Sequence, residues 1–409
     1  MRVIHVNNTD LPGRRFNGYD LLSELESRGV SGKQAVLMKS SNSSDVISLL
    51  NTPEDAALQR ACTAVEQRYS MNDLIFPWGA VLTETAEFKN ADLVHLHLIH
   101  NEMISLFDVP RIVGLKPCVW TFHDAWPMTG HCVYPRQCER WLTGCEICPS
   151  LDAHFPMLED RASRMWKVKQ RVLADIDVDV VVASEFMLEM VQRSPLTAHL
   201  ENVHLIPFGI DTNAFLPEHE KLASRKALGI PKDDFVVLFR STASEFKGLR
   251  YIIEALSLAS PSRPTTLVTV DQKGLVKSLE SKYNVIELGW VNEQALLPRA
   301  FSASDVLLMP STAEAFGLMA LEAMAASRPV ICFEGTSLPG VTHAPECGIA
   351  VPMCDAVALR SAIDSLAADA SEIERRGRLG RALADEHHSH ELYLDRMASL
   401  YRGVLERRG

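Results

Sequence analysis

The stretch DVLLMPSTAEAFGLMALEAMAASRPVICF, from Asp305 to Phe333, contains two short apolar runs separated by a segment rich in Ala, Leu and Met. Each run is apolar at successive positions, as strands buried on both faces of a parallel sheet are. Pro310 ends the first run, and Pro329 ends the segment between the runs because proline cannot continue a helix. We therefore expect a strand, a loop, a helix that begins near Gly317, and a second parallel strand.

The same alternation of strands and helices continues on both sides of a break near residue 210. This pattern predicts an α/β protein with two doubly wound, Rossmann-like domains that face each other across a cleft. We expect an N-terminal domain over residues 1–207, a C-terminal domain over 208–388, and a helix over 389–409 that crosses back to the first domain. Other expected helices cover residues 18–29 and 248–260.

Composition limits the classes of function. The chain has 409 residues, a hydrophobic content of 47% and a formal net charge of -11, which argues against a nucleic-acid-binding surface. No apolar run is long enough to span a membrane, and the first residues lack the apolar core of a signal peptide. We therefore expect a cytoplasmic protein, and contact with the inner face of the membrane stays open.

Two glutamates, Glu314 and Glu322, flank the expected start of the helix. The first-turn N–H groups of a helix attract phosphate, and here Phe316, Gly317 and Leu318 would present them. Glu322 lies about five residues, at roughly 1.5 Å each, beyond the helix start, which matches the span from a diphosphate to its ribose. A nucleotide sugar would then place its sugar near Glu314 and its ribose at Glu322. The alternative is that both are solvated glutamates on a partly exposed helix.

Glu314 and Glu322, followed by a small-residue helix and "RPV", resemble the E-x7-E signature of retaining glycosyltransferases of family 4 type with the GT-B fold. The resemblance implies transfer of a hexose from a nucleotide-diphosphate sugar with retained anomeric configuration. It implies that Glu314 positions hydroxyls of the donor sugar and supports an oxocarbenium-like transition state. No metal is expected to be required for the transfer.

The segment FRSTASEFKG, residues 239–248, directly follows an expected strand. The family has an Arg and a Lys here that bind the donor diphosphate, and Arg240 and Lys247 match them. Fixed cations are needed because the leaving nucleoside diphosphate gains charge as the glycosidic bond breaks. Phe239 stands where a glycine usually precedes the arginine, and the Arg–Lys spacing is slightly longer than the commonest form.

Further positions of the resemblance lie at the ends of other strands. In VWTFHDAWP, His123 occupies the place of a family histidine that faces the donor sugar, and a neutral or charged imidazole can exchange hydrogen bonds there. Gly13, in the loop after the first strand, partly matches a Gly-Gly pair near the donor phosphates. In LGWV, backbone groups of Gly289 and Trp290 would read the nucleobase.

A cluster of cysteines, spaced C-x5-C-x6-C-x2-C, lies in the loop over residues 130–149. Four thiolates this close can bind one tetrahedral Zn²⁺, which would hold together a long loop without secondary structure. An iron–sulfur cluster or four reduced thiols are the alternatives. Similar insertions occur in a subset that resembles colanic-acid and exopolysaccharide glycosyltransferases. The expected ligands are Cys132, Cys138, Cys145 and Cys148.

These features predict a retaining hexosyltransferase of polysaccharide biosynthesis. A UDP- or GDP-sugar would be the donor, and a glycan or polyprenyl-linked glycan the acceptor. A lipid-linked acceptor would bring the protein to the membrane surface. Two alternatives stay open: another GT-B enzyme, such as a sugar-nucleotide epimerase or a glucan synthase, and a non-catalytic scaffold that binds nucleotide sugars.

Overall fold

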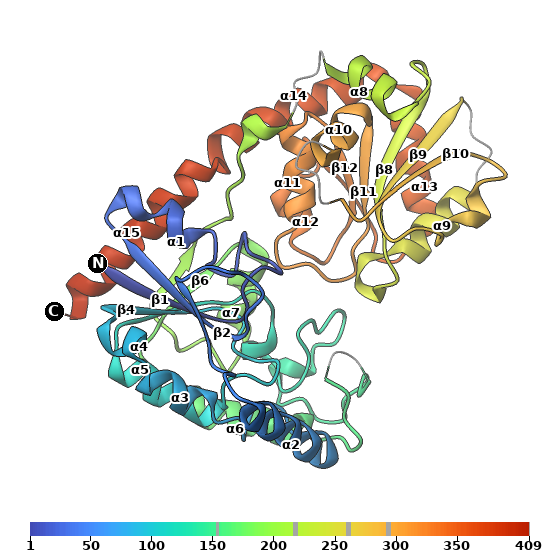
Figure 1. The fold of residues 1–409 in the computed structure, drawn as a ribbon. Coiled ribbons are helices and arrows are strands. Elements are labelled where there is room, and N and C mark those ends of the chain that lie inside the picture. The colour runs from blue at the N-terminus through green and yellow to red at the C-terminus, as the bar shows by residue number, and fades with distance from the viewer. Residues whose placement is uncertain (153–154, 216–219, 259–262, 292–295, 409) are drawn as a thin grey trace. The chain divides into compact units, whose positions relative to one another are not determined.

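The computed structural model describes residues 1–152, 155–215, 220–258, 263–291 and 296–408. The chain forms two compact units (Figure 1). The first contains Met1–Ile206 and the chain from Tyr393 onward, and the second contains Pro207–Leu392. Each unit has its own parallel sheet and its own buried core.

The sheet of the first unit has seven parallel strands in the order β3-β2-β1-β4-β5-β6-β7. Its inner strands are buried along most of their length, as their apolar sequences predict. The strands are β1 (Arg2–Thr9), β2 (Ser31–Met38), β3 (Val46–Ser48), β4 (Leu93–Leu96), β5 (Cys118–Thr121), β6 (Asp179–Val182) and β7 (Val203–Leu205).

The helices of the first unit connect these strands (Figure 1). They are α1 (Leu21–Glu24), α2 (Pro53–Tyr69), α3 (Trp78–Glu84), α4 (Ala86–Asn90), α5 (Val109–Leu115), α6 (Ala162–Leu173), α7 (Glu185–Arg193) and most of α15 (His390–Arg408).

The expected helix over residues 18–29 is much shorter than its pattern suggested. α1 has one turn, and a 3-10 turn, Glu26–Arg28, follows it before Gly29 reverses the chain at a φ of 78°. Leu22 and Leu25 are both buried, so the predicted buried face of this segment is confirmed. The predicted length of the helix is wrong. Asp20 at the N-cap makes no side-chain capping bond, so the helix lacks a strong start signal.

α15 belongs to the core of the first unit. The Tyr401 hydroxyl lies 2.6 Å from Nδ1 of His95 on β4, and both side chains are buried. Arg28 donates from Nε to Asp395 at 2.7 Å. The C-terminal helix therefore covers part of the sheet formed by the first two hundred residues.

The second unit has six parallel strands in the order β10-β9-β8-β11-β12-β13. They are β8 (Phe235–Ser241), β9 (Thr265–Asp271), β10 (Asn284–Gly289), β11 (Val306–Met309), β12 (Val330–Phe333) and β13 (Ile349–Val351). The helices are α8 (Lys221–Leu228), α9 (Leu249–Ser257), α10 (Leu296–Ala303), α11 (Leu318–Ala325), α12 (Leu338–Val341), α13 (Ala356–Ala368) and α14 (Ala370–His387). Residues 259–260, at the end of the expected helix 248–260, lie outside the described residues.

In each sheet the strand that comes first in the chain, β1 or β8, lies inside the sheet, and the order runs outward from it in both directions, as in doubly wound nucleotide-binding folds. The predicted fold class is thus confirmed: an α/β protein with two Rossmann-like sheets. In such sheets ligands bind at the carboxyl ends of the strands, where the order reverses. In the second unit that point lies between β8 and β11.

Candidate active site

The carboxyl end of β8 carries the predicted Arg240. Its Nε donates to Oδ2 of Asp271 at 2.7 Å, and its side chain is 40% exposed. Asp271 ends β9 with a φ of 88°, a left-handed conformation that is uncommon for a residue with a side chain. The neighbouring strand therefore supplies a carboxylate that orients the arginine, and the sequence analysis did not identify it.

Lys247 and Glu314 meet at this edge of the sheet. Nζ of Lys247 lies 2.7 Å from Oε2 of Glu314. Lys247 stands in a 3-10 turn after β8, and Glu314 in the loop between β11 and α11. These two strands are neighbours in the sheet, which is why residues 67 positions apart come together.

The turn that holds Lys247 is followed by a tightly packed glycine. Gly248 has a φ of 73°, and a Cβ at this position would lie 1.9 Å from the carbonyl oxygen of Pro310. Only a residue without a side chain lets the β8 loop approach the β11 loop this closely. Gly248 thus brings Lys247 within reach of Glu314.

α11 begins next to Gly317, as the sequence predicted, but Phe316 lies before the helix and not in its first turn. Gly317 is its N-cap with a φ of 102°, and a Cβ there would lie 2.5 Å from Leu338. The first amides bonded to the Gly317 carbonyl are those of Ala320 and Leu321, so the amides of residues 317–319 precede the helical ladder. Phe316 is buried, with its ring 5.3 Å from that of Phe208. Leu318 is half-buried.

The two glutamates have different surroundings. Glu322 is 1% exposed within α11, so the alternative of a solvated surface glutamate is wrong for this residue. The Glu314 side chain is 12% exposed and paired with Lys247. A carboxylate buried in an apolar helix is costly, which is consistent with a specific use.

Gly289 and Trp290 lie at the end of β10. The pairing with β9 is irregular between Glu287 and Gly289, and Gly289 has a φ of 75°. A Cβ on Gly289 would lie 2.7 Å from Cε of Lys273. Trp290 is 69% exposed, which leaves a large aromatic surface at the same edge of the sheet.

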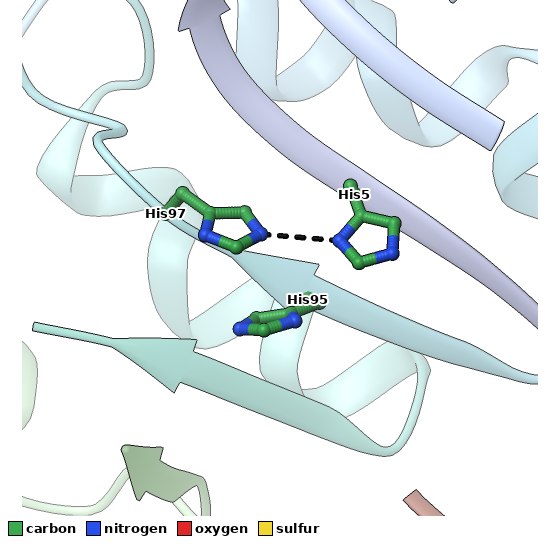
Figure 2. Close-up of side chains that lie close together, drawn as sticks. All are labelled: His5, His95 and His97. Atoms are coloured by element: carbon green, nitrogen blue, oxygen red, sulfur yellow. Dashed lines mark hydrogen bonds between the residues drawn. The ribbon is translucent and has the colours of Figure 1, made fainter. Parts of the chain in front are cut away.

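In the first unit, the half-buried His123 ends a chain that continues through the buried His97 and His5. Its Nε2 lies 3.1 Å from Nδ1 of His97, and Nε2 of His97 lies 3.1 Å from Nδ1 of His5. Figure 2 shows His5, His95 and His97 together, with the contact between His5 and His97 drawn as a dashed line. The strand order β1-β4-β5 places these side chains side by side.

Burial lowers the pKa of each of these imidazoles and so favours its neutral form. It lowers the pKa of His5 to about 3 and that of His123 to about 4. The pKa values of His95 and His97 are also lowered by burial. The lowered pKa favours the neutral imidazole of His123 over the imidazolium that an unperturbed pKa would allow at mildly acidic pH.

Ring nitrogens of His5, His95 and His97 lie within 4.8 Å of one another, a spacing that a metal ion would also allow. However, His95 already contacts Tyr401 and, at 2.7 Å, the Thr121 hydroxyl. His5 and His97 contact each other. These contacts account for most ring nitrogens, so we interpret the cluster as a hydrogen-bonded chain.

Gly13 packs against Phe16, and the Phe16 ring in turn lies next to His123 at the end of the histidine chain. It has a φ of 73°, and a Cβ there would lie 2.5 Å from the Phe16 ring. The Phe16 ring is 5.4 Å from that of His123. The structure thus brings two predicted residues, Gly13 and His123, against the same aromatic ring.

A second group of buried polar side chains, His100, Asp124 and Lys169, lies near the histidine chain. It was not predicted as a group from the sequence. His100 contacts Asp124 at 3.0 Å, and the Trp126 amide donates to the same carboxylate. Burial raises the pKa of Asp124, but His100, the Trp126 amide and His123 together outweigh it and hold the pKa below its usual value. Lys169 donates to the carbonyls of Trp126 and Thr129, and burial lowers its pKa to about 7.

The four predicted metal ligands lie in the folded loop after His123. Cys145 is buried, and its Sγ accepts from the Gly130 amide at 3.3 Å. Burial, with smaller contributions from the other loop cysteines, raises the pKa of Cys132 to about 12 and that of Cys145 to about 11. Over the described residues, no three of the sulfurs lie within 4.8 Å of one another. Cys132 interacts electrostatically with the other three thiols, but in the described chain the sulfurs are not as close together as the ligands of one bound ion.

Comparison with solved structures shows which proteins share this fold. Sucrose-phosphate synthase from Thermosynechococcus elongatus aligns over 100% of both chains, with a TM-score of 0.70 and 19% identity. WaaG, a glycosyltransferase involved in lipopolysaccharide biosynthesis, covers 98% of this chain and 99% of its own, with a TM-score of 0.66 and 16% identity. Anabaena HepE in complex with UDP and glucose covers 98% and 100%, with a TM-score of 0.62 and 16% identity. The architecture is that of the GT-B glycosyltransferases.

Sequence comparison adds matches over parts of the chain. Residues 220–383 match the family described as glycosyl transferases group 1. A colanic acid biosynthesis glycosyl transferase of Escherichia coli, WcaC, is 34% identical over 91 residues, 20% of this chain and 22% of that protein. D-inositol 3-phosphate glycosyltransferase of Segniliparus rotundus is 27% identical over 320 residues, 71% of this chain and 69% of that protein.

Matches to the first five curated relatives span between 22% and 47% of their lengths. The chain therefore matches less than half of the length of each of these five relatives. In the described part of this chain, no helix is both long and apolar enough to cross a membrane.

Proposed function

We propose that the protein is a retaining hexosyltransferase of family 4 type that acts in polysaccharide biosynthesis. The observation that carries the proposal is the contact between Lys247 and Glu314, beside the glycine-led start of α11. A cation, a carboxylate and unpaired helix amides at one sheet edge suit a diphosphate joined to a sugar.

Each residue at this edge has a distinct role in the proposal. Arg240, Lys247 and the amides of residues 317–319 hold the diphosphate and stabilise the charge it gains as the glycosidic bond breaks. Glu314 accepts hydrogen bonds from hydroxyls of the donor sugar, and Glu322 from the ribose. Gly289 and Trp290 contact the base. Fixed cations supply the charge, so the transfer requires no metal.

We further propose a UDP- or GDP-sugar as donor. The complex of the HepE fold relative with UDP and glucose supports a uridine nucleotide. A glycan or a polyprenyl-linked glycan is the proposed acceptor, which suits a protein at the inner face of the membrane. The acidic net charge of -11 supports the proposal that nucleic acid is not a partner.

For the cysteine loop we propose a structural zinc ion with Cys132, Cys138, Cys145 and Cys148 as ligands. Zinc–sulfur bonds are about 2.3 Å long, so the four sulfurs would have to draw together on binding. The proposal is supported by the ligand chemistry and by the proximity of the thiols. The ion would stabilise the loop and has no part in the transfer.

The direct test is a thermal-shift panel with UDP-, GDP-, ADP- and dTDP-sugars. A ligand that binds only the native state raises the melting temperature. We expect a shift with one nucleotide, a smaller shift for Glu322→Gln, and an unchanged shift for the exposed control Glu280→Gln. The anomeric configuration of the transferred sugar, read by proton NMR, then tests retention. A product with inverted configuration would contradict the mechanism, and no shift with any donor would contradict donor binding.

A further inference from the structure

A short segment at the carboxyl end of β9, residues 271–274, contacts the loop that carries the two predicted phosphate-binding cations. It begins at Asp271, which accepts from Arg240. The side-chain oxygen of Gln272 then accepts from the Ala243 amide at 3.0 Å, within the loop between Arg240 and Lys247. Contacts from two successive residues therefore fix this segment against the predicted diphosphate site.

The next two residues of the segment contact the end of β10. A Cβ on Gly289 would lie 2.7 Å from Cε of Lys273, so the lysine side chain packs directly on this glycine. Nζ is bonded to Cε, and the ammonium group is therefore held beside Gly289. The Gly274 amide donates to Glu287, at 2.8 Å to Oε1 and 3.0 Å to Oε2. A cation and a carboxylate thus accompany Gly289 at the carboxyl end of β10.

The strand register relates these groups to the diphosphate site. Arg240 is paired with Val270 of β9, and Val270 is paired with Gly289 of β10. Because β8, β9 and β10 are neighbours in the sheet (Figure 1), the three residues form one row across it. Two strand spacings, about 9–10 Å in all, separate Arg240 from Gly289. A nucleotide has its ribose between the diphosphate and the base, so a ligand held by Arg240 can present its base at Gly289.

Lys273 and Glu287 keep hydrogen-bonding capacity for a ligand. The Lys273 side chain is exposed, and among the residues that the structure describes none forms an ion pair with it. Glu287 is half-buried, and its two oxygens share a single amide. An ammonium group has three donors and no acceptor, whereas an ionised carboxylate only accepts. Together they offer a ligand one donating and one accepting group.

We propose that Lys273 and Glu287 select the nucleobase of the donor by its hydrogen-bonding edge. Uracil, guanine and hypoxanthine present a carbonyl oxygen next to a ring N–H, which match the ammonium and the carboxylate. Adenine and cytosine present an amino group next to a bare ring nitrogen, so donor would face donor and acceptor would face acceptor. Stacking on the exposed Trp290 is available to every base and adds affinity without this selection.

The inference rests on the donor site of the proposed function and names the residues that choose its nucleotide. Calorimetric titration of the full chain with four nucleoside diphosphates tests it. Inosine and adenosine diphosphate have purines of nearly the same size with opposite edges, and UDP and CDP are the corresponding pyrimidine pair. In the pair whose ring size fits, the carbonyl-bearing nucleotide should bind at least about tenfold more tightly. UDP against inosine diphosphate then distinguishes a pyrimidine from a purine site.

Variants assign the preference to the two side chains. Lys273→Met retains the aliphatic stem and removes the ammonium, so the preference should fall to about threefold or less. Glu287→Gln keeps an oxygen for the neighbouring amide but loses the charge, and should also reduce the preference. Lys232→Met and Glu280→Gln are the matched controls. They alter exposed groups that precede β8 and β10, at the opposite edge of the sheet, and should leave the preference unchanged.

Failure of this inference is distinct from failure of the proposed function. If none of the nucleoside diphosphates binds, donor binding fails and the inference fails with it. If nucleotides bind but the members of each pair bind equally, the inference alone is overturned. It is also overturned if adenosine diphosphate or CDP is preferred within its pair, or if Lys273→Met and Glu287→Gln both keep the full preference.

Discussion

Nζ of Lys247 and Oε2 of Glu314 lie 2.7 Å apart, although 67 residues separate them. In this arrangement the cation expected to hold the donor diphosphate is paired with the carboxylate expected to hold the donor sugar. A donor that binds here exchanges part of this pair for its own phosphate and hydroxyl groups. The pair keeps both charges compensated when the donor is absent.

Lys247→Met should reduce transfer strongly. The lysine stabilises charge that grows on the leaving diphosphate, and removing one such group costs about 10²–10³ in kcat, or roughly 2.7–4 kcal/mol. Lys247→Arg should retain part of the activity. Steady-state kinetics with the donor found in the thermal-shift panel measures the loss. Lys277→Met, at an exposed position of the same unit, is the control. Equal losses in both methionine variants would show that Lys247 has no special role.

Gly248→Ala should destabilise the second unit more than Gly229→Ala. Both glycines have left-handed φ angles, 73° and 71°. For each, a side chain adds a conformational cost of about 1–2 kcal/mol. A Cβ on Gly229 meets no atom within 4 Å, whereas one on Gly248 would lie 1.9 Å from the Pro310 carbonyl. Urea denaturation should therefore place the midpoint of Gly248→Ala clearly below that of Gly229→Ala. A reversed order would contradict the close approach of the two loops.

The histidine chain should make stability depend on pH. Burial lowers the pKa of His5 to about 3 and of His123 to about 4, below the value of about 6.5 in the unfolded chain. Between the folded and unfolded pKa values the unfolded state binds more protons than the native state. The contribution of these histidines to the free energy of unfolding is therefore complete above about pH 6.5 and is lost as the pH falls toward about 4. His5→Gln should reduce the slope of unfolding free energy against pH in this window.

The comparison with His5→Gln is necessary because Asp73 has the opposite sign. Burial raises its pKa to about 7, so its contribution declines as the pH rises through the same window. The slope difference between the native chain and the variant cancels Asp73. An unchanged slope in His5→Gln would contradict the assignment of a neutral, buried His5.

Protein purified without chelators should contain about one equivalent of zinc, as expected for a single four-thiolate site. Cys145→Ser should lower the zinc content and the melting temperature, because a lost ligand opens the loop. Cys62→Ser, which alters a buried thiol of the same unit outside the loop, is the control. Less than about a tenth of an equivalent of zinc or iron in the native protein would contradict a metal site.

Much of the second unit could be predicted because its features are local. The strand, loop and helix over residues 306–325 follow from the position of proline, the glycine before the helix and the apolar runs. Their prediction requires only neighbours in sequence. The error at α1 has the same origin, because apolar spacing shows which face is buried but not how many turns form.

Contacts between strands could not be predicted in this way. The pairing of Arg240 with Asp271 requires that β8 and β9 are neighbours in register, and in the sheet these two residues are one position apart. The histidine chain similarly depends on the order β1-β4-β5, in which His5 is paired with His95. Before the order is known, the histidines of HLHLIH are only a repeated residue type.

The sequence by itself determined the α/β class, the two sheets and the motif that carries the resemblance to glycosyltransferases, because hydrophobic period and turn chemistry act over a few residues. Only the tertiary structure decided that burial lowers the pKa of His123, that Glu322 is buried, and that Lys247 pairs with Glu314. Burial and pairing depend on which distant segments pack together, and strand order and register set those contacts.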